Sequence, residues 1–254
     1  MQCEQAGMII IGDEILYGSR RDRHFDHVRQ ILASSGGQLA WVKILPDHEA
    51  LLTEELGRSM AAELPVFCFG GIGATPDDVT RQCAARAAGV PLALHPGAVA
   101  EIEAQFGPAA YPRRIQMAEL PEGSRLIPNP VNRVPGFSLG HHYFFPGFPE
   151  MAWPMLEWVL QHDYPNTAAR LQEVYLRVFD VGESELVELM QRLIARHPDV
   201  KLFSLPRLGR RRHIELGFRG RQGVAQALAD LAEGLRQAGV RFEASDGADV
   251  NKGK

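Results

Sequence analysis

The chain has 254 residues, 45% of them hydrophobic and 23% charged, a balance typical of one large or two ordinary globular domains. The formal net charge of −4 gives no general attraction for nucleic acid, and no stretch is apolar for long enough to predict a membrane-spanning helix. The three cysteines lack metal-ligand spacing and the start lacks a leader pattern, which together favour reduced thiols in a cytoplasmic protein.

The first predicted strand is the apolar run at residues 7–11, which ends at Gly12 and is followed at once by Asp13 and Glu14. Short apolar runs of this kind are typical of buried parallel strands. Ligands of open α/β sheets bind beyond the carboxyl ends of the strands, so both acids are candidate site residues. A solvated turn between a strand and a helix would give the same pattern.

A basic stretch at residues 20–23 precedes a predicted helix that begins with His24 and His27. The arginines either steer a phosphate or belong to a solvated loop. The two histidines are three residues apart on a helix, a spacing that metal binding can use. No third ligand lies nearby in the sequence, so we expect both to be solvated or capping residues.

The stretch that organises the chain is the glycine cluster at residues 70–73, which follows a predicted strand at 66–69. Thr75, Pro76 and an acid at the third helical position have the pattern of a helix start, and Gly89 supplies the C-terminal end. Glycines permit positive φ and bare backbone, so successive N–H groups can face an anion at a positive helix end. The pattern predicts a phosphate cradle.

Two carboxylates, Asp77 and Asp78, stand at the same turn. They would repel a bare phosphate unless a divalent cation bridged them, which indicates a metal–phosphate site. The alternative is a capped helix in which both acids only stabilise the dipole. Neither common nucleotide motif decides the matter, because no P-loop lysine follows and the glycine spacing is not G-x-G-x-x-G.

The remaining apolar runs alternate between strand and helix patterns. They predict a strand at 39–45, a helix at 51–60, a strand at 91–94 and a helix at 97–106. This alternation favours an α/β fold with a mostly parallel sheet covered on both faces. Residues 108–140 are rich in proline, glycine and asparagine and are predicted to form an ordered functional loop. A second strand-to-helix turn with a glycine and an acid lies at 142–151.

A linker is predicted at residues 162–169, between a first domain at 1–165 and a second at 171–244. The second domain has the β-α-β-β-α-β order of a small α+β ferredoxin-like fold. Its middle hairpin carries the basic run Arg207, Arg210, Arg211 and Arg212. Without interleaved aromatic residues, this run indicates a solvated hairpin or subunit contact more than nucleic-acid binding. The polar tail at 245–254 is predicted to be disordered.

Taken in order, four motifs resemble the MogA/MoaB-like molybdopterin-binding superfamily, most closely the amino-terminal domain of the competence-damage-inducible protein A (CinA) family. The matching segments are residues 12–16, 70–80, 128–137 and 146–151, within roughly residues 7–160. The segment at 171–244 is similar to the smaller domain that follows in that family. The deamidase domain of longer members has no counterpart in these residues, so deamidation is not expected.

The resemblance implies a three-layer α/β/α sandwich that binds a pterin phosphate or a nucleotide diphosphate. Family members include metal-dependent ADP-ribose pyrophosphatases, and a similar domain beside eukaryotic FAD synthase hydrolyses FAD. In the molybdenum-cofactor branch, the acid that Asp78 matches serves adenylyl chemistry. Ala74 stands where the family has proline, and residues 132–134 replace a G-T-A triplet, which implies altered specificity. Arg133 would then bind a second phosphate or face solvent.

The resulting hypothesis is metal-dependent hydrolysis of an ADP-ribose-like or FAD-like diphosphate. Asp13, Asp77 and Asp78 would hold magnesium, manganese or cobalt, and Asp78, Asp13 and Glu14 would be catalytic, with Glu14 or Glu150 as general base. The expected phosphate and ring contacts are Gly12, Gly70, Gly71, Gly73, Thr75, Asn129, Pro130, Pro146, Gly147, Phe148, Pro149 and Glu150.

Two alternatives stay open: adenylyl transfer or pterin handling in molybdenum-cofactor synthesis, with molybdopterin as ligand, and a non-catalytic binding protein. The expected partners are a small nucleotide or pterin and further copies of the chain in a dimer or trimer. Neither nucleic acid nor a membrane is expected as a partner.

Overall fold

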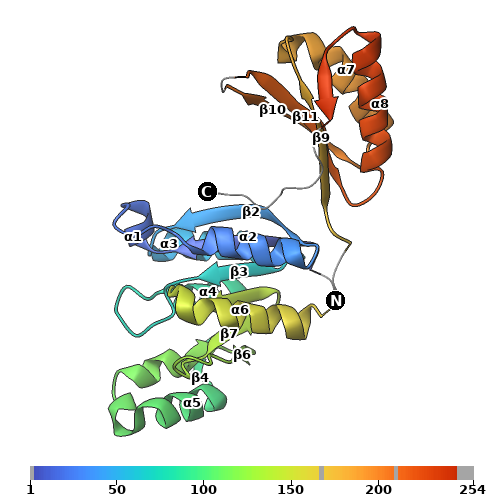
Figure 1. Ribbon diagram of the computed structural model, residues 1–254. Helices are drawn as coiled ribbons and strands as arrows, with labels where there is room; N and C mark the ends of the chain where they lie inside the picture. The colour runs from blue at the N-terminus through green and yellow to red at the C-terminus, as the bar shows by residue number, and fades with distance from the viewer. Residues whose placement is uncertain (1–2, 166–168, 209–210, 245–254) are drawn as a thin grey trace. The chain divides into compact units, whose positions relative to one another are not determined.

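The computed structural model describes residues 3–165, 169–208 and 211–244, and its chain divides into two compact units with the boundary between residues 168 and 169 (Figure 1). The predicted tail at 245–254, part of the linker and Arg210 lie outside the described residues. No helix among the described residues is both long and apolar enough to cross a lipid bilayer.

The first unit is built on a six-stranded sheet with the order β2-β1-β3-β8-β7-β6. The strands are β1 (Gln5–Ile11), β2 (Gln38–Leu45), β3 (Val66–Phe69), β6 (Arg125–Ile127), β7 (Gly136–Leu139) and β8 (His142–Phe145). The first four in spatial order run parallel, β7 pairs antiparallel with β8, and β6 pairs antiparallel with β7. The predicted α/β fold class is confirmed, with a mixed sheet.

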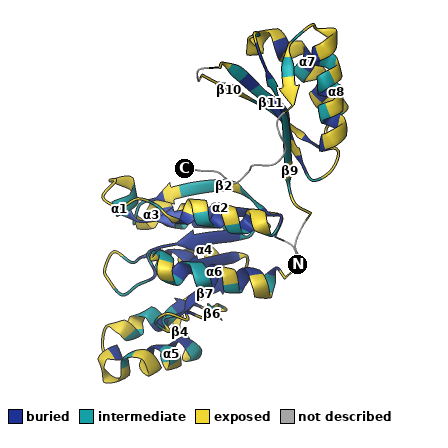
Figure 2. Cartoon of the chain, in the orientation of Figure 1, coloured by how far each residue is buried: buried dark blue, intermediate teal, exposed yellow. Residues whose placement is uncertain are grey.

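Helices cover both faces of this sheet because the side chains of each buried strand alternate between two cores. Ile9 and Ile11 of β1 pack with α3 (Glu49–Met60), α4 (Thr80–Ala88) and α5 (Pro96–Phe106). Met8 and Ile10 pack with α2 (His24–Ser34) and α6 (Pro149–Asp163). The central strands β1, β3 and β8 are accordingly buried and the outer helix faces exposed, as Figure 2 shows, which makes the predicted three-layer sandwich.

The prediction of one long loop at 108–140 is wrong, because the stretch contains regular structure. Strands β6 and β7 extend the main sheet, where Phe137 stacks on Phe144 of β8 with ring centroids 4.5 Å apart. The rest holds two 3-10 turns, η1 (Gly107–Ala110) and η2 (Arg114–Ala118), and the short strand β5 (Glu119–Pro121). The predicted strand near 91–94, β4 (Leu92–Leu94), pairs only with β5 and stays outside the main sheet.

The predicted start of the helix after the glycine cluster is also wrong in position. Helix α4 begins at Thr80, and Thr75 is not its N-cap. Instead the Asp78 carboxylate accepts hydrogen bonds from the N–H of Thr75 at 2.9 Å and from the Thr75 hydroxyl, while Asp78 N–H donates to the Thr75 carbonyl at 3.0 Å. These bonds close a separate turn before the helix. Gly89, with φ of 68°, ends α4 as predicted.

Two glycines are required where β3 meets this turn. Gly70 has φ of 111°, and a Cβ on it would lie 2.1 Å from the Ile11 carbonyl oxygen of β1. Gly71 has φ of 67°, and a Cβ on it would lie 2.2 Å from Oγ1 of Thr80. Any side chain at either position would collide with its neighbour, in a backbone conformation that L-residues rarely adopt.

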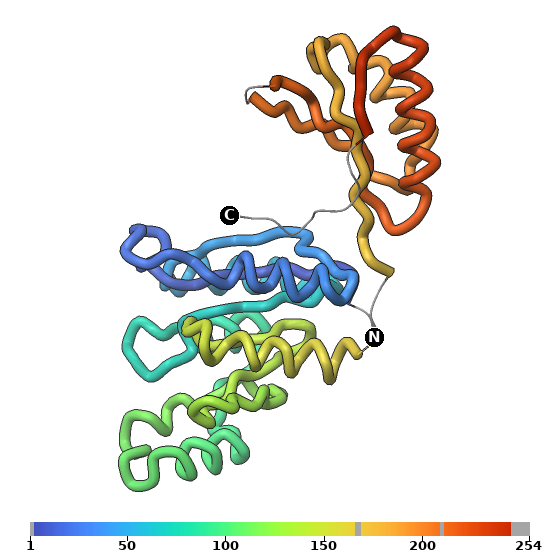
Figure 3. The backbone as a smooth tube through the Cα atoms, viewed as in Figure 1, coloured from blue at the N-terminus to red at the C-terminus, as the bar shows by residue number. Residues whose placement is uncertain are grey.

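The second unit is built on a four-stranded antiparallel sheet with the order β10-β11-β9-β12, drawn in the gold-to-red part of the tube in Figure 3. Its elements are β9 (Gln172–Val178), α7 (Glu183–Arg196), β10 (Lys201–Arg207), β11 (His213–Gly220), α8 (Val224–Gln237) and β12 (Phe242–Ala244). Both helices pack on the face that carries Leu176 and Leu216. Among the described residues of this unit, no helix covers the opposite face, which carries Arg177 and Glu215. Residues 162 and 163, predicted as linker, belong to α6.

His142 of β8 supplies a testable pH dependence. It is 1% exposed, its Nε2 donates to Oγ of Ser59 in α3 at 2.8 Å, and burial lowers its pKa from 6.5 to about 4. A depressed histidine pKa gives stability that is complete above pH 6.5 and is lost as pH falls towards 4. Relative to His142→Gln, which keeps an N–H donor and does not titrate, the wild type should lose about 3 kcal/mol of unfolding free energy between pH 7 and pH 4.

Urea unfolding followed by tryptophan fluorescence measures this loss in the first unit, which contains Trp41, Trp153 and Trp158. The exposed neighbour His141 provides the control, since its charge only adds to the effect of burial on the pKa of His142 and His141→Gln should keep most of the wild-type loss. Parallel profiles for wild type and His142→Gln would contradict the assignment.

Gly71→Ala should destabilise the first unit by about 1–3 kcal/mol, because it forces a positive φ on alanine and a collision with Thr80. Gly57 in α3 is the matched control, since a Cβ there meets no described atom within 4 Å. Gly57→Ala should therefore stabilise the protein by up to about 1 kcal/mol. Thermal denaturation distinguishes the opposite signs, and equal shifts would show that the turn is not constrained.

Candidate functional site

Three neighbouring strands, β1, β3 and β8, end at one edge of the first unit's sheet. Gly70 N–H donates to the Phe145 carbonyl at 3.0 Å, and the Cα of Gly70 lies 3.4 Å from where a Cβ of Gly147 would stand. The carbonyl of Ile11 lies against the other side of Gly70. The structure therefore brings Gly12, the glycine cluster and Gly147 to one place, at the strand ends where α/β sheets bind ligands.

The turn after β3 presents backbone donors. The N–H groups of residues 71–74 have no hydrogen-bond acceptor anywhere in the described parts of the chain, whereas those of Gly70 and Thr75 on either side are bonded. Ile72 among them is buried. Unpaired N–H groups at the end of a buried strand are costly unless water or a ligand accepts from them, so the turn is suited to an anion.

The carboxylate of Asp78 serves the turn itself. It is half-buried, accepts both hydrogen bonds from Thr75, and one of its oxygens lies 2.5 Å from where a Cβ of Gly73 would stand. Asp77 is exposed beside it, and hydrogen bonding to the Thr75 hydroxyl and to its own N–H lowers its pKa. Asp78 therefore shapes the backbone cradle, and Asp77 is the acid of the pair whose carboxylate extends into solvent.

Asp47 is a site residue that the sequence interpretation missed. It follows the end of β2, and its Oδ2 accepts a hydrogen bond from the backbone N–H of Asp13 at 3.1 Å. Its Oδ1 lies 3.4 Å from where a Cβ of Gly71 would stand, so it reaches the glycine turn as well. The sequence pattern could have indicated Asp47, because it follows a predicted strand just as Asp13 does.

Burial raises the pKa of Asp47, and the hydrogen bond from Asp13 N–H opposes that rise. The carboxylates of Asp13, Glu14 and Asp77 raise the pKa further, which shows that the fields of three other acids meet at this carboxyl group. Within residues 3–165, 169–208 and 211–244, however, no three His, Cys, Asp or Glu side chains are close enough to form a ready-made metal site. Asp13, Asp77 and Asp78 are therefore not gathered into one such centre.

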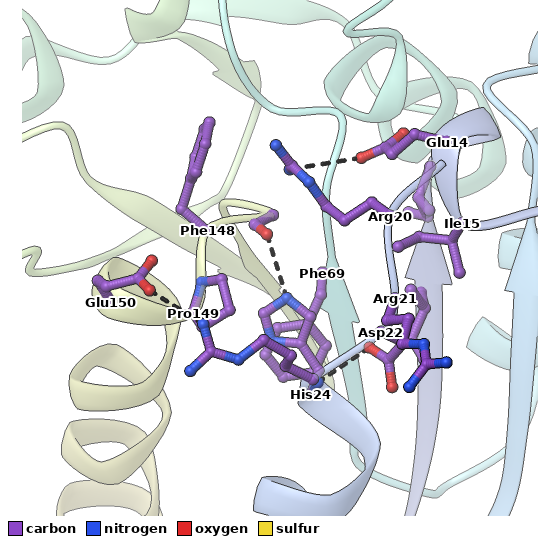
Figure 4. Close-up of a pocket in the computed structure, with 14 residues that line it drawn as sticks. Glu14, Ile15, Arg20, Arg21, Asp22, His24, Phe69, Phe148, Pro149 and Glu150 are labelled. Carbon is purple, nitrogen blue, oxygen red and sulfur yellow. Dashed lines mark hydrogen bonds and ion pairs between the residues drawn. The ribbon is translucent and has the colours of Figure 1, made fainter. Parts of the chain in front are cut away.

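A cavity of about 300 Å³ lies beside the strand ends, as Figure 4 shows. Its walls come from the ends of β1 and β3, from Glu14 of α1 (Asp13–Leu16), from residues 20–24 and from residues 147–150. Four of the predicted contacts, Gly147, Phe148, Pro149 and Glu150, thus line the same cavity as the basic stretch. Phe148 is 51% exposed and lies at the wall without being packed into the core.

His24 departs from the prediction that it would be solvated or capping. It is 4% exposed, stacks on Phe69 with centroids 4.5 Å apart, and its Nε2 lies 3.2 Å from the carbonyl oxygen of Gly147 (Figure 4). Because a carbonyl only accepts, Nε2 carries the proton. Burial lowers the pKa of His24, so the ring is held neutral. His24 therefore stabilises the turn at Gly147. His27 stacks on Trp153, with ring centroids 4.1 Å apart.

The arginines of residues 20–23 border the cavity. Arg20 lies 3.7 Å from Glu14 and its guanidinium stands 5.5 Å from the centre of the Phe148 ring. Arg23 donates to Glu150 at 3.3 Å. Each acid proposed as a general base is thus paired with an exposed arginine, and such pairs are weak enough for a ligand to displace.

The loop at 128–134 is held in shape by hydrogen bonds of its own residue Asn129. Asn129 is buried, donates to Asn132 Oδ1 at 2.7 Å and to the Val134 carbonyl at 3.0 Å, and accepts from Val131 N–H at 3.0 Å. Asn132 contacts the sulfur of Met151 in the first turn of α6 at 3.1 Å. Asn129 thereby sets the loop's shape against α6, next to the cavity-lining residues 147–150.

Arg133, at the tip of this loop, has φ of 60° and donates to Glu101 of α5 at 2.8 Å. Its charge is therefore already partnered by an exposed carboxylate.

Comparison with known proteins confirms the resemblance. A family model described as a probable molybdopterin binding domain matches residues 7–166. A CinA-like protein of Citrifermentans bemidjiense is 32% identical over 206 residues, covering 78% of this chain and 50% of that protein. A putative competence-damage inducible protein of Symbiobacterium thermophilum is 29% identical over 211 residues, covering 76% and 48%. The chain spans about half the length of the curated relatives it matches.

Among solved structures, CinA of Thermoplasma acidophilum, whose function is described as unknown, matches with a TM-score of 0.58 and 27% identity. The match covers 63% of this chain and 97% of that one. Sequence, family model and fold agree: the chain belongs to the MogA/MoaB-like molybdopterin-binding superfamily and is a CinA-like member of it.

Proposed function

We propose that the strand-end site hydrolyses the diphosphate bond of an ADP-ribose-like or FAD-like substrate with the help of a divalent cation. The observation that carries this proposal is the run of four unpartnered N–H groups at 71–74, within the described residues, beside the acids at Asp13, Asp47 and Asp77. The N–H groups suit a phosphate, and the acids suit a cation that accompanies it. Without a cation, the carboxylates would repel the diphosphate that the N–H groups attract.

The residues fit a cation that arrives with its substrate better than one held permanently. Magnesium commonly takes one or two carboxylates and completes its shell with water and substrate phosphates, so a three-carboxylate centre is not needed. The raised pKa of Asp47 supports this, because a cation would relieve the repulsion that contributes to it. We assign Asp47 to the cation in place of Asp78, which bonds Thr75, with either Asp13 or Asp77 as a second carboxylate.

When bound, magnesium, manganese or cobalt would polarise a phosphoryl oxygen and lower the pKa of a bound water. The turn at 71–74 would hold the phosphate and stabilise the charge that develops on it. Glu14, displaced from Arg20, would accept the proton of the attacking water, and Glu150 is the alternative base. Phe148 and the adjoining cavity would receive the aromatic ring of the substrate.

Binding or adenylation of molybdopterin is the second candidate, supported by the description of the matching family model as a probable molybdopterin binding domain. It uses the same turn and cavity. A metal-independent rise in melting temperature with a pterin phosphate, without release of AMP from ADP-ribose, would favour it over hydrolysis. Assembly into dimers or trimers is compatible with either function.

Asp47→Asn should lower the rate of AMP release from ADP-ribose by at least about tenfold, the scale of loss at residues that support a metal. The amide oxygen of the new side chain can still accept from Asp13 N–H, so the fold should persist. Asp26→Asn on α2 is the matched control, because Asp26 is 79% exposed and lies outside the site. A rate in Asp47→Asn equal to that of Asp26→Asn would exclude a metal role for Asp47.

The same variant gives a readout that is independent of turnover. A carboxyl group with a raised folded-state pKa destabilises the native state as pH rises above its unfolded value of 3.8. In metal-free buffer, the melting temperature of Asp47→Asn relative to wild type should therefore increase from pH 4 to pH 7. Manganese should raise the wild-type melting temperature at pH 7 and leave Asp47→Asn nearly unchanged. If manganese raised the melting temperatures of wild type and Asp47→Asn equally, the cation would not bind at Asp47.

A further inference from the structure

The second unit contains a basic hollow that the proposed function does not use. We propose that this hollow binds a small molecule carrying two or more linked phosphate groups. Its volume is about 390 Å³, within the range of small-molecule sites. The residues that line it are Arg177, Phe179, Arg207, Leu208, Arg211, His213 and Glu215.

The hollow lies on the face of the sheet that α7 and α8 leave uncovered. Arg177 of β9 stands opposite Glu215 of β11, and Arg207 of β10 stands opposite His213. Residues directly opposite each other in an antiparallel pair lie on the same face, so strands that are distant in sequence contribute to one surface. The lining holds three guanidinium groups and one carboxylate.

Two of the guanidinium groups are held in place by partners. Arg207 donates to Glu215 at 2.7 Å. Arg211 donates to Glu243 at 2.6 Å and lies 4.5 Å from the centre of the buried Phe179 ring. A guanidinium has five N–H donors, so each keeps free donors after these contacts. Fixed donors lose less entropy when they bind a ligand, which favours recognition of an anion at this place.

Arg177 is the guanidinium of the lining that forms no ion pair within the described residues, although Glu215 and Glu243 stand opposite it on the two neighbouring strands. It is half-buried and makes no hydrogen bond, ion pair or ring contact with any residue in the described ranges. Glu215, which stands opposite it, bonds Arg207 and lies 3.8 Å from His213 instead. Glu243 bonds Arg211, so both neighbouring carboxylates are bonded to other arginines and Arg177 keeps its five N–H donors for an anion. The hollow is therefore suited to more than one negative charge.

The chemistry of the ligand follows from the charges and the size. Phosphate oxygens match the forked donors of arginine, and three guanidinium groups match a chain of phosphates better than a single one. The positive surface is short, because Arg219 on the same face is already paired with Glu173 at 2.8 Å. A small oligophosphate, either inorganic or part of a nucleotide, fits this short surface better than a nucleic-acid strand.

Calorimetric titration of the full chain tests the proposal in metal-free buffer, with inorganic tripolyphosphate and ADP as separate probes. Arg177→Gln should weaken binding of either probe roughly tenfold or more, the scale of a lost charge-assisted hydrogen bond. Arg177→Lys, which keeps the charge, should fall between Arg177→Gln and wild type. The probe that binds with the higher affinity shows whether the ligand is an inorganic oligophosphate or a nucleotide.

Arg192→Gln is the matched control, because Arg192 is exposed on α7, outside the hollow, and carries the same charge change. It also separates the hollow from the glycine turn of the first unit, since binding at that turn would respond equally to both variants. Equal affinities in Arg177→Gln and Arg192→Gln would overturn the proposal. Tighter binding of a single-stranded RNA decamer than of tripolyphosphate would also overturn it.

Discussion

The approach of Gly70 to the Ile11 carbonyl is the constraint on which the first unit's site depends. The strands β1 and β3 are hydrogen-bonded neighbours, and the chain can leave β3 at this point only if position 70 carries no Cβ. Gly71 then turns with positive φ under Thr80, whose hydroxyl donates to the Gly70 carbonyl at 3.0 Å. The N–H groups of residues 71–74 are left without acceptors among the described residues because the backbone is bent rather than helical here.

The acids around this turn have different tasks despite their similar sequence positions. The carboxylate of Asp78 stabilises the turn, since it accepts hydrogen bonds from the N–H and the hydroxyl of Thr75. Asp47 is anchored by Asp13 N–H and feels the charge of three other acids. Local hydrogen bonding thus separates a carboxylate that shapes the backbone from one whose charge is uncompensated, and only an uncompensated charge gains by meeting a cation.

The basic stretch at residues 20–23 and the basic hollow of the second unit differ in how their arginines are paired with acids. Arg20 and Arg23 face Glu14 and Glu150 across the first unit's cavity, so their charges are balanced before any ligand arrives. The second unit's hollow is lined by three guanidinium groups and one carboxylate, Glu243 bonds Arg211 beside it, and Arg177 forms no ion pair within the described residues. The density of basic residues along the chain is similar, but the placement of acids on neighbouring strands decides which run keeps a net positive charge.

Apolar runs that end in glycine were sufficient to predict β1, β3 and β8 and the edge at which a site would form. Strand formation depends on neighbouring residues, and a parallel sheet places such ends together. The tertiary structure alone decided that α4 starts at Thr80, that His24 is buried on Phe69, and that Asp47 joins Asp13. It also decided that β6 and β7 extend the main sheet while β4 does not. These outcomes depend on contacts between residues distant in sequence, whose energies no local pattern contains.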